Sequence, residues 1–152
     1  MKKVLITGMS GLIGGLLRRH LEDLGGYELT ALNRRAVEGV KCFQADVTNL
    51  EAIKPAFEGQ DVVAHLAAYL GSEDFEGQLA GNVVGAYNVY EAARLAGVKR
   101  VVFASSGNSI RGFERVPPYS DIAAGRFDRV REDFTLVTGE MVRPRGIYGA
   151  AK

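Results

Sequence analysis

The chain has 152 residues, a length typical of one domain with its own hydrophobic core. Hydrophobic residues make up 47% and charged residues 24%, as in ordinary globular proteins, and a net charge of +1 gives no electrostatic footprint for nucleic acid. No apolar run approaches the roughly 18 residues of a membrane span. Because Cys42 is solitary, no disulfide framework can form, and a reducing cytoplasm is expected.

The N-terminal segment has the pattern of a strand, a glycine turn and a helix. Residues 2–7 form the short apolar run of a buried strand, and leucines recur at helical spacing over 12–24. Between them lies Thr-Gly-x-x-Gly-x-x-Gly, in which Gly8 permits a tight turn, Gly11 lets a pyrophosphate approach, and Gly14 lets the helix pack closely. The helix N-terminus would attract phosphate. The segment predicts dinucleotide binding; the alternative is an ordinary strand–helix turn.

Strands and helices then alternate along the chain. The pattern predicts an α/β fold, a Rossmann-type doubly wound parallel sheet with helices on both faces, in a single domain over residues 1–152. The carboxyl ends of its strands would meet along one edge, where ligands bind in such sheets. The strands expected after the first are 27–32, 40–45, 61–66 and 99–104, and the helices expected after the first are 49–57, about 78–96 and one starting near 145.

The end of the second strand bears on the choice of cofactor. An acidic residue there would bind a ribose 2′-hydroxyl and select NAD, but this chain has Asn33, Arg34 and Arg35. Guanidinium groups can hold a 2′-phosphate through charge-assisted hydrogen bonds, so NADP is favoured over NAD. The alternative is that the arginines are solvated loop residues.

At the other end of the sequence, Tyr148 precedes Lys152 by four positions, which places both on one face of a helix. A nearby ammonium favours the phenolate, and moving a phenol pKa from about 10 to about 7 takes roughly 4 kcal/mol. Tyr148 could then act as an acid/base near neutral pH. The alternative is an amphipathic helix end with a solvated lysine.

Together, the glycine turn and Tyr-Gly-x-x-Lys resemble the extended branch of the short-chain dehydrogenase/reductase superfamily, the NAD(P)-dependent epimerase/dehydratase family. The run from Ser105 to Phe113 and the approach to Tyr148 look closer to its sugar-acid (uronate) dehydrogenases. Other segments that agree are Asp46-Val47, His65-Leu66-Ala67-Ala68, the run from Asn82 to Asn88, and Ser105-Ser106.

The resemblance implies an enzyme that transfers hydride between NAD(P) and a sugar or nucleotide-sugar derivative. Tyr148 would pass the proton, Lys152 would lower its pKa and hold the nicotinamide ribose, and Ser106 would orient the substrate. In many epimerases the working hydroxyl can fall where this chain has Gly107, so the serine assignment stays open. The cofactor-binding residues implied are Gly8, Ser10, Gly11, Leu12, Ile13, Gly14, Asn33, Arg34, Arg35, Asp46, Val47, Leu66, Ala67, Ala68, Asn82, Tyr148 and Lys152.

Three other features have two interpretations each. Asp46 would bind the adenine amino group by resemblance, or it belongs to the N-cap region of the next helix. His65 has no His, Cys or carboxylate at ligand spacing, so no metal site is expected and we interpret it as a strand residue flanking the cofactor. The stretch 111–142 is a solvated loop, or its arginines form a basic lip that meets an anionic substrate.

Members of the family continue well past the lysine, so we expect the chain to be an N-terminal half without its substrate domain. Little turnover is then expected from residues 1–152 alone. Two further readings stay open: a dinucleotide-binding module without chemistry, and a structural half that pairs with another polypeptide. The expected partner is a small sugar or nucleotide-sugar substrate, with no nucleic acid or membrane, and a homodimer is left open.

Overall fold

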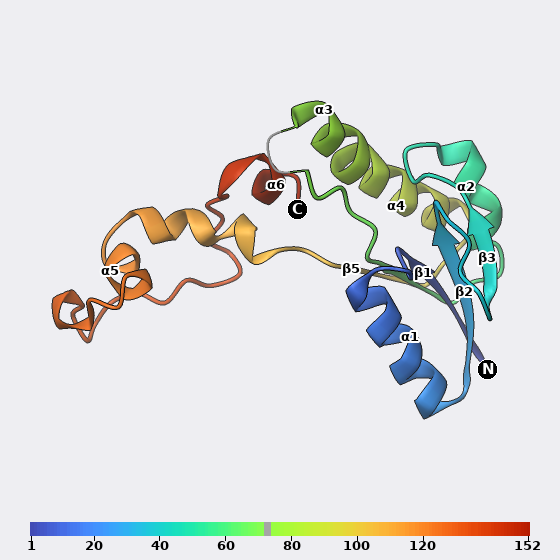
Figure 1. The fold of residues 1–152 in the computed structure, drawn as a ribbon, viewed down its shortest axis with the longest axis horizontal. Coiled ribbons are helices and arrows are strands. Elements are labelled where there is room, and N and C mark those ends of the chain that lie inside the picture. Colours follow the sequence, from blue (N-terminus) through green and yellow to red (C-terminus); the bar gives the residue numbers. More distant parts are fainter. Residues whose placement is uncertain (72–73) are drawn as a thin grey trace. The chain divides into compact units, whose positions relative to one another are not determined.

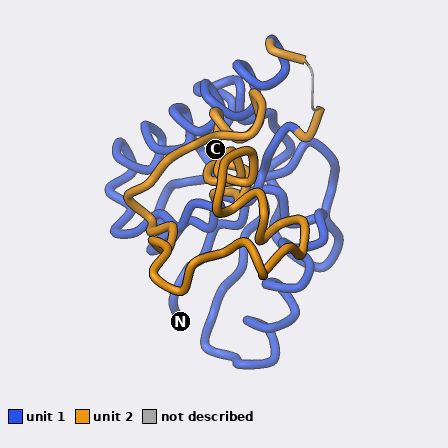
Figure 2. The backbone as a smooth tube through the Cα atoms, turned by 90° about the vertical axis from the view of Figure 1, so that its left-hand side faces the viewer, with its two compact units in different colours: residues 1–69, 76–104 blue, residues 70–75, 105–152 orange. Residues whose placement is uncertain are grey.

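The computed structural model describes residues 1–71 and 74–152, which divide into two compact units (Figure 2). The first unit comprises Met1–Tyr69 and Glu76–Ala104, and the second comprises Leu70–Phe75 in its described part and Ser105–Lys152. The expected single domain over residues 1–152 stays a prediction.

The first unit is built on a five-stranded parallel sheet in the order β3-β2-β1-β4-β5. Thr7 pairs with both Leu32 and His65, and His65 pairs with Phe103, so the carboxyl ends of four strands meet at one edge. The chain changes direction across the sheet between β1 and β4, which is where such folds bind ligands. The strands are β1 Lys2–Thr7, β2 Tyr27–Asn33, β3 Lys41–Gln44, β4 Val62–His65 and β5 Arg100–Phe103.

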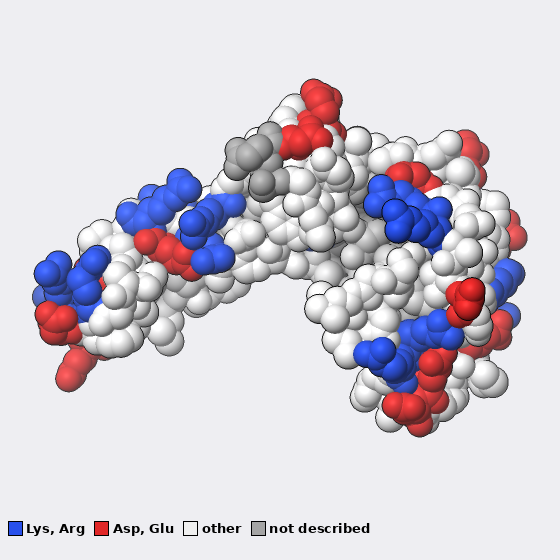
Figure 3. Space-filling view, viewed as in Figure 1, with Lys and Arg blue, Asp and Glu red and all other residues white. Residues whose placement is uncertain are grey.

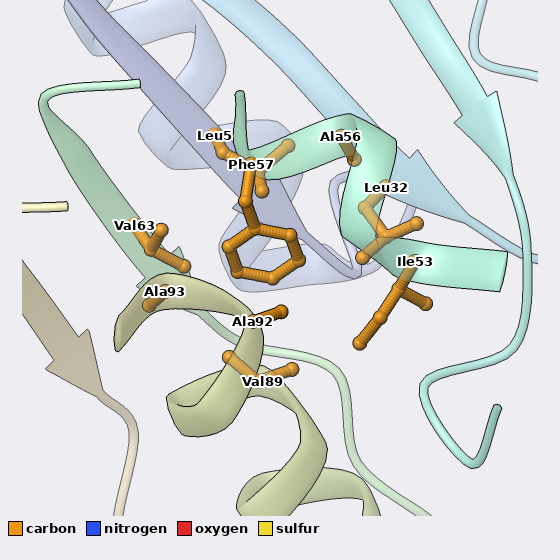
Figure 4. Close-up of a cluster of buried hydrophobic side chains, with 9 residues drawn as sticks. All are labelled: Leu5, Leu32, Ile53, Ala56, Phe57, Val63, Val89, Ala92 and Ala93. Atoms are coloured by element: carbon orange, nitrogen blue, oxygen red, sulfur yellow. The ribbon is translucent and has the colours of Figure 1, made fainter. Parts of the chain in front are cut away.

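Helices cover both faces of this sheet, α1 (Leu12–Leu24) on one side and α2 (Leu50–Phe57) and α4 (Gly85–Leu95) on the other (Figure 1). Alternate residues of β1 point to opposite faces. Leu5 therefore joins the cluster with α2 and α4 that surrounds Phe57 (Figure 4), whereas Ile6 joins the cluster on the α1 side. The predicted doubly wound α/β fold is confirmed.

A single helix is expected over about 78–96, and the structure is helical from Phe75 to Leu95, but the part Leu79–Val84 is a π-helix rather than an α-helix. The segment consists of α3 (Phe75–Gln78), the π-helix η1 (Leu79–Val84) and then α4. Asn82 accepts a hydrogen bond from the backbone N–H of Tyr69 (2.8 Å) and donates one to its carbonyl (2.9 Å). A Cβ on Gly81 would lie 2.7 Å from the Cβ of Tyr69. The wider turn thus accompanies a close contact with residues distant in sequence.

The second unit has short helical segments where the sequence indicated either a loop or a basic lip. The ring centroid of Tyr119 lies 5.4 Å from that of Phe113 and 6.4 Å from that of Phe134. Contacts between aromatic rings therefore hold residues 113–134 together. The helices are η2 Gly107–Ser109, η3 Arg111–Arg115, α5 Tyr119–Ala123, η4 Phe127–Arg129 and α6 Gly146–Ala150.

Candidate functional site

The three glycines of the first turn are required for different structural reasons. Gly8 has a φ of 72°, and a Cβ there would lie 2.8 Å from the backbone nitrogen of Ala67. A Cβ on Gly14 would overlap the carbonyl of Gly8 and lie 2.6 Å from the Cα of Met9. At Gly11 it would meet only the Gly8 oxygen, at 3.3 Å. Gly8 and Gly14 therefore keep parts of the protein close together, whereas the space at Gly11 is largely open.

The N-terminus of α1 suits a phosphate group. Gly11 is its N-cap and provides no side-chain cap, and no acidic residue lies in the first turn. The unpaired N–H groups of a first turn carry partial positive charge, which favours an anion. Leu12 and Ile13 are 82% and 62% exposed, and Ser10 is also exposed. This end of the helix therefore fits the pyrophosphate of a dinucleotide.

Thr7 joins the glycine turn to the loop after β4, a role that the sequence interpretation missed. Its Oγ1 accepts hydrogen bonds from the N–H groups of Leu66 and Ala67, both at 3.1 Å, and lies 2.7 Å from Nδ1 of His65. His65 is buried and its ring lies 5.5 Å from that of Phe103. A hydroxyl residue at the end of a buried strand was the only sequence signal for this network.

Asn33 ends β2 with a polar side chain that is only 8% exposed. Its Nδ2 donates a hydrogen bond to Oγ of Ser10 at 2.6 Å, while its Oδ1 is buried and has no partner among the described residues. Buried acceptors are nearly always satisfied, so an unpartnered oxygen at the end of β2 is an unusual feature of this position. Arg34 and Arg35 follow with exposed side chains.

Asp46 belongs to the N-cap region of α2, as the alternative interpretation of this residue predicted. Oδ1 of Asp46 accepts a hydrogen bond from the N–H of Thr48 (3.0 Å), and Asn49 caps α2 by accepting from the N–H of Ala52 (3.1 Å). The contact of Asp46 with adenine stays a prediction. The same holds for Val47, Leu66, Ala67, Ala68 and Asn82 as cofactor contacts.

In the second unit, Tyr148 lies on α6 and lines a pocket of about 600 Å³. Pockets of this size hold small organic ligands. Three guanidinium groups, one amide and one leucine side chain share its wall with the phenol. The lining residues are Leu70, Asn108, Arg111, Arg115, Arg145, Gly146 and Tyr148.

Backbone hydrogen bonds hold the walls of this pocket together. The N–H of Arg145 donates to the carbonyl of Asn108 (2.8 Å), and the N–H of Gly112 donates to that of Arg143 (2.7 Å). A Cβ on Gly112 would lie 2.5 Å from the Arg143 oxygen, and one on Gly149 would overlap the carbonyl of Asn108. Both glycines therefore allow the approach to α6 to pack against η2 and η3.

Lys152 lies just beyond α6, because the last helical hydrogen bond joins the N–H of Ala151 to the carbonyl of Ile147 (3.0 Å). Its side chain is half-buried, and this burial lowers the pKa of its ammonium group below the usual 10.5. The hydroxyl of Ser105 donates to the carbonyl of Lys152 at 2.9 Å, while Oγ of Ser106 accepts from the N–H of Asn108 at 3.2 Å. The catalytic roles of Ser106, Tyr148 and Lys152 stay predictions.

Residues 1–71 and 74–152 contain neither a cluster of metal ligands nor a helix that could span a membrane. No group of three or more His, Cys, Asp and Glu side chains is placed to hold a metal ion. No helix in the same ranges is long and apolar enough to cross a membrane.

Comparison with known proteins identifies the family. The model of the NAD dependent epimerase/dehydratase family matches residues 4–152. The chain belongs to this family. The family model thus covers both the glycine turn and the Tyr-Gly-x-x-Lys segment, and it confirms the resemblance inferred from the sequence.

Proteins similar to this chain include sugar dehydrogenases and a nucleotide-sugar epimerase. Uronate dehydrogenase of Agrobacterium fabrum is 34% identical over all of this chain and 52% of its own length. L-arabinose 1-dehydrogenase (NAD(P)(+)) of Haloferax volcanii is 33% identical over all of this chain and 58% of its own length. The structure of Thermus thermophilus UDP-glucose 4-epimerase with NAD has a TM-score of 0.76 at 27% identity, covering 99% of this chain and 47% of that one. The chain thus spans about half the length of these relatives.

Proposed function

We propose that the chain forms the cofactor-binding and proton-transferring part of an NAD(P)-dependent dehydrogenase or epimerase that acts on a sugar or nucleotide-sugar derivative. The observation that carries this proposal is the glycine turn. Gly8 and Gly14 bring β1, α1 and the loop after β4 together, and the uncapped helix end faces open space at Gly11. The names of the relatives, which are dehydrogenases and an epimerase, suggest the reaction class.

The proposed cofactor is NADP, with NAD as the alternative. Gly11 and the first turn of α1 would hold the pyrophosphate, and Asn33, at the end of β2, would lie beside the adenosine ribose. Arg34 and Arg35 are exposed and are proposed to bind the 2′-phosphate. One relative carries NAD(P)(+) in its name, which is consistent with either cofactor.

The nicotinamide cofactor, when bound, supplies or accepts the hydride. We assign the accompanying proton transfer to the phenol of Tyr148, which lines the pocket of the second unit. Lys152 is proposed to act on Tyr148 as a nearby cation, and Ser106 to bind the substrate oxygen. The solitary Cys42 supports a reducing cytoplasm as the site of action.

The proposal is tested by titrating the purified chain with NADPH and NADH and following nucleotide fluorescence. We expect saturable binding of at least one cofactor. A valine side chain at position 11 would occupy the space left for the pyrophosphate, so Gly11→Val should weaken binding by about tenfold or more, because the helix N–H groups lose their phosphate contacts.

Gly139→Val is the matched control for added bulk, since position 139 is exposed and a Cβ there has no heavy atom within 4 Å. It should leave cofactor binding unchanged. Equal NADPH and NADH affinities for Gly11→Val and the parent chain would show that this turn is not the cofactor site.

A further inference from the structure

The arginines between positions 111 and 145 differ in their surroundings. Some are neutralised by neighbouring carboxylates outside the pocket lining, as in the pairs of Arg126 with Asp121 (2.8 Å) and Arg131 with Asp133 (2.9 Å). Others line the pocket that contains Tyr148. The lining arginines are Arg111, Arg115 and Arg145.

Two of the three lining arginines share one carboxylate. Glu114 binds Nε of Arg111 at 2.9 Å and Nη1 of Arg145 at 3.1 Å. The hydrogen bond from Arg111 is the main reason that the pKa of Glu114 lies below its ordinary value, and Arg145 adds to the effect. Glu114 therefore stays ionised at neutral pH and fixes two guanidinium groups beside each other.

Arg115 has no such partner. Among the described residues no carboxylate forms an ion pair with it, and its side chain is exposed. The three arginines and Glu114 together carry a net charge of +2 at neutral pH. Lys and Arg atoms are prominent on the second unit in Figure 3, with acidic atoms beside them.

The pocket wall complements a ligand with hydroxyl groups and one anionic end. Asn108 and Tyr148 provide hydrogen-bonding groups, Leu70 provides apolar surface, and no acidic residue is among the described lining residues. A guanidinium group binds carboxylate and phosphate oxygens through paired N–H donors. A neutral sugar would offer no oxyanion to these guanidinium groups, of which Arg115 has no carboxylate partner among the described residues.

We propose that this pocket binds the oxyanion of an anionic sugar derivative, through Arg115 together with Arg111 and Arg145, beside Tyr148. The inference rests on the proposed function and names the class of its substrate. The oxyanion is a carboxylate, as in a hexuronate, or a phosphate, as in a hexose phosphate or a nucleotide sugar. Glu114 acts as a positioning residue that holds Arg111 and Arg145.

Calorimetric titration of the chain with four ligands tests the proposal in the presence of saturating NADPH. The ligands are D-glucuronate, D-glucose 6-phosphate, UDP-glucose and neutral D-glucose. At least one anionic ligand should bind about tenfold or more tightly than D-glucose, and its affinity should fall as salt is added. The tightest of the three anionic ligands identifies the oxyanion as carboxylate, monophosphate or diphosphate.

Matched variants locate the binding site. Arg115→Gln should weaken binding of the preferred anionic ligand by about tenfold, because a charge-assisted hydrogen bond is lost, and leave D-glucose binding unchanged. Arg115→Lys keeps the charge without the paired donors and should lose less. Arg129→Gln removes an exposed arginine that does not line the pocket and should have no effect. Circular dichroism spectra that match the parent's would show that the variants are folded.

Three outcomes would overturn the inference: no anionic ligand binds better than D-glucose, Arg115→Gln has no effect, or Arg129→Gln weakens binding as much as Arg115→Gln. The last would indicate attraction by the general charge of the surface. Cofactor titration reports separately on the proposed function. If the unchanged chain bound neither NADPH nor NADH, that function would be contradicted. If it bound a cofactor but did not prefer anionic sugars, only this inference would be contradicted.

Discussion

Asn33 and the two arginines after it stand at the end of β2, where the choice between NAD and NADP is made in this fold. The amide of Asn33 is held by Ser10, so the strand end presents a neutral side chain rather than a carboxylate. A carboxylate there would repel a 2′-phosphate, and the neutral amide does not. The two exposed guanidinium groups would add attraction for a 2′-phosphate, as the proposed choice of NADP requires.

We therefore predict that the double change of Arg34 and Arg35 to Ser weakens NADPH binding by about tenfold or more and leaves NADH binding nearly unchanged. Only NADPH carries the 2′-phosphate. Fluorescence titration measures both affinities. The matched control is the double change of Lys99 and Arg100 to Ser, which removes the same charge at the amino end of β5. Equal losses for both cofactors, or none, would reject the assignment of NADP.

Burial of Lys152 gives a pH-dependent prediction. Its folded-state pKa is lowered below 10.5 because burial disfavours the ammonium. Between the folded and unfolded pKa values the unfolded chain holds the extra proton, so stability rises with pH in that window. Above pH 10.5 the Lys152 amine is neutral in both states, so its burial carries no charge penalty. As the pH falls through the folded pKa the folded protein has to bury an ammonium group, and this part of its stability is lost. NMR titration of the Lys152 side chain should give a midpoint below 10.5, and Lys152→Met should remove this part of the pH dependence. A midpoint at or above 10.5 would contradict the prediction.

The packing of helix α1 against the glycine turn requires that position 14 has no side chain. Gly14 and Gly15 are adjacent in the same helix, but a Cβ on Gly14 would overlap the backbone at Gly8 and Met9, whereas one on Gly15 would have its nearest neighbour at 3.9 Å. The backbone at Gly8 and Met9 cannot move without disturbing the glycine turn. Alanine substitutions at these two positions therefore separate the effect of helix propensity on stability from the effect of packing.

Gly14→Ala should lower the free energy of unfolding by about 1–3 kcal/mol, the usual cost of overpacking. Gly15→Ala should leave it unchanged or raise it by up to about 1 kcal/mol, because alanine is the better helix former. Urea denaturation measures both. The packing explanation predicts opposite signs or a clear gap between the two variants, and similar losses in both would contradict it.

The elements that sequence reasoning predicted well are those with local causes. The bounds of α1 predicted from the leucine spacing and the glycine turn are the observed ones. The five strands predicted from the apolar runs agree with the observed strands to within a residue or so at each end. The π-helical form of Leu79–Val84 was missed because it accompanies a contact of Asn82 with Tyr69, thirteen positions away, that local sequence does not indicate. The pocket was missed as a unit for the same reason, since pairing of Glu114 with both Arg111 and Arg145 depends on tertiary structure.

At the scale of the whole molecule, buried apolar surface is distributed unevenly between the two units. Among the described residues every buried hydrophobic side chain belongs to the first unit, in the two clusters on either face of the sheet. The buried residues of the described second unit are Gly112 and Gly149. Full burial of a large apolar side chain contributes roughly 1.5–3 kcal/mol, so the first unit has much the larger source of stability.

Amide hydrogen exchange should therefore be slowest in β1, β2 and β4 and at least about tenfold faster in the second unit, because local opening there exposes little apolar surface. The comparison is fair for amides that are hydrogen-bonded in both units. In the second unit these include the N–H groups of Gly112 (2.7 Å) and Arg145 (2.8 Å), and in the first the N–H of Gly8, which donates to Leu32 (3.1 Å). Exchange followed by mass spectrometry or NMR measures the difference. If the amides of Gly112 and Arg145 exchanged as slowly as those of β1, the second unit would have a source of stability other than buried apolar side chains, and the prediction would fail.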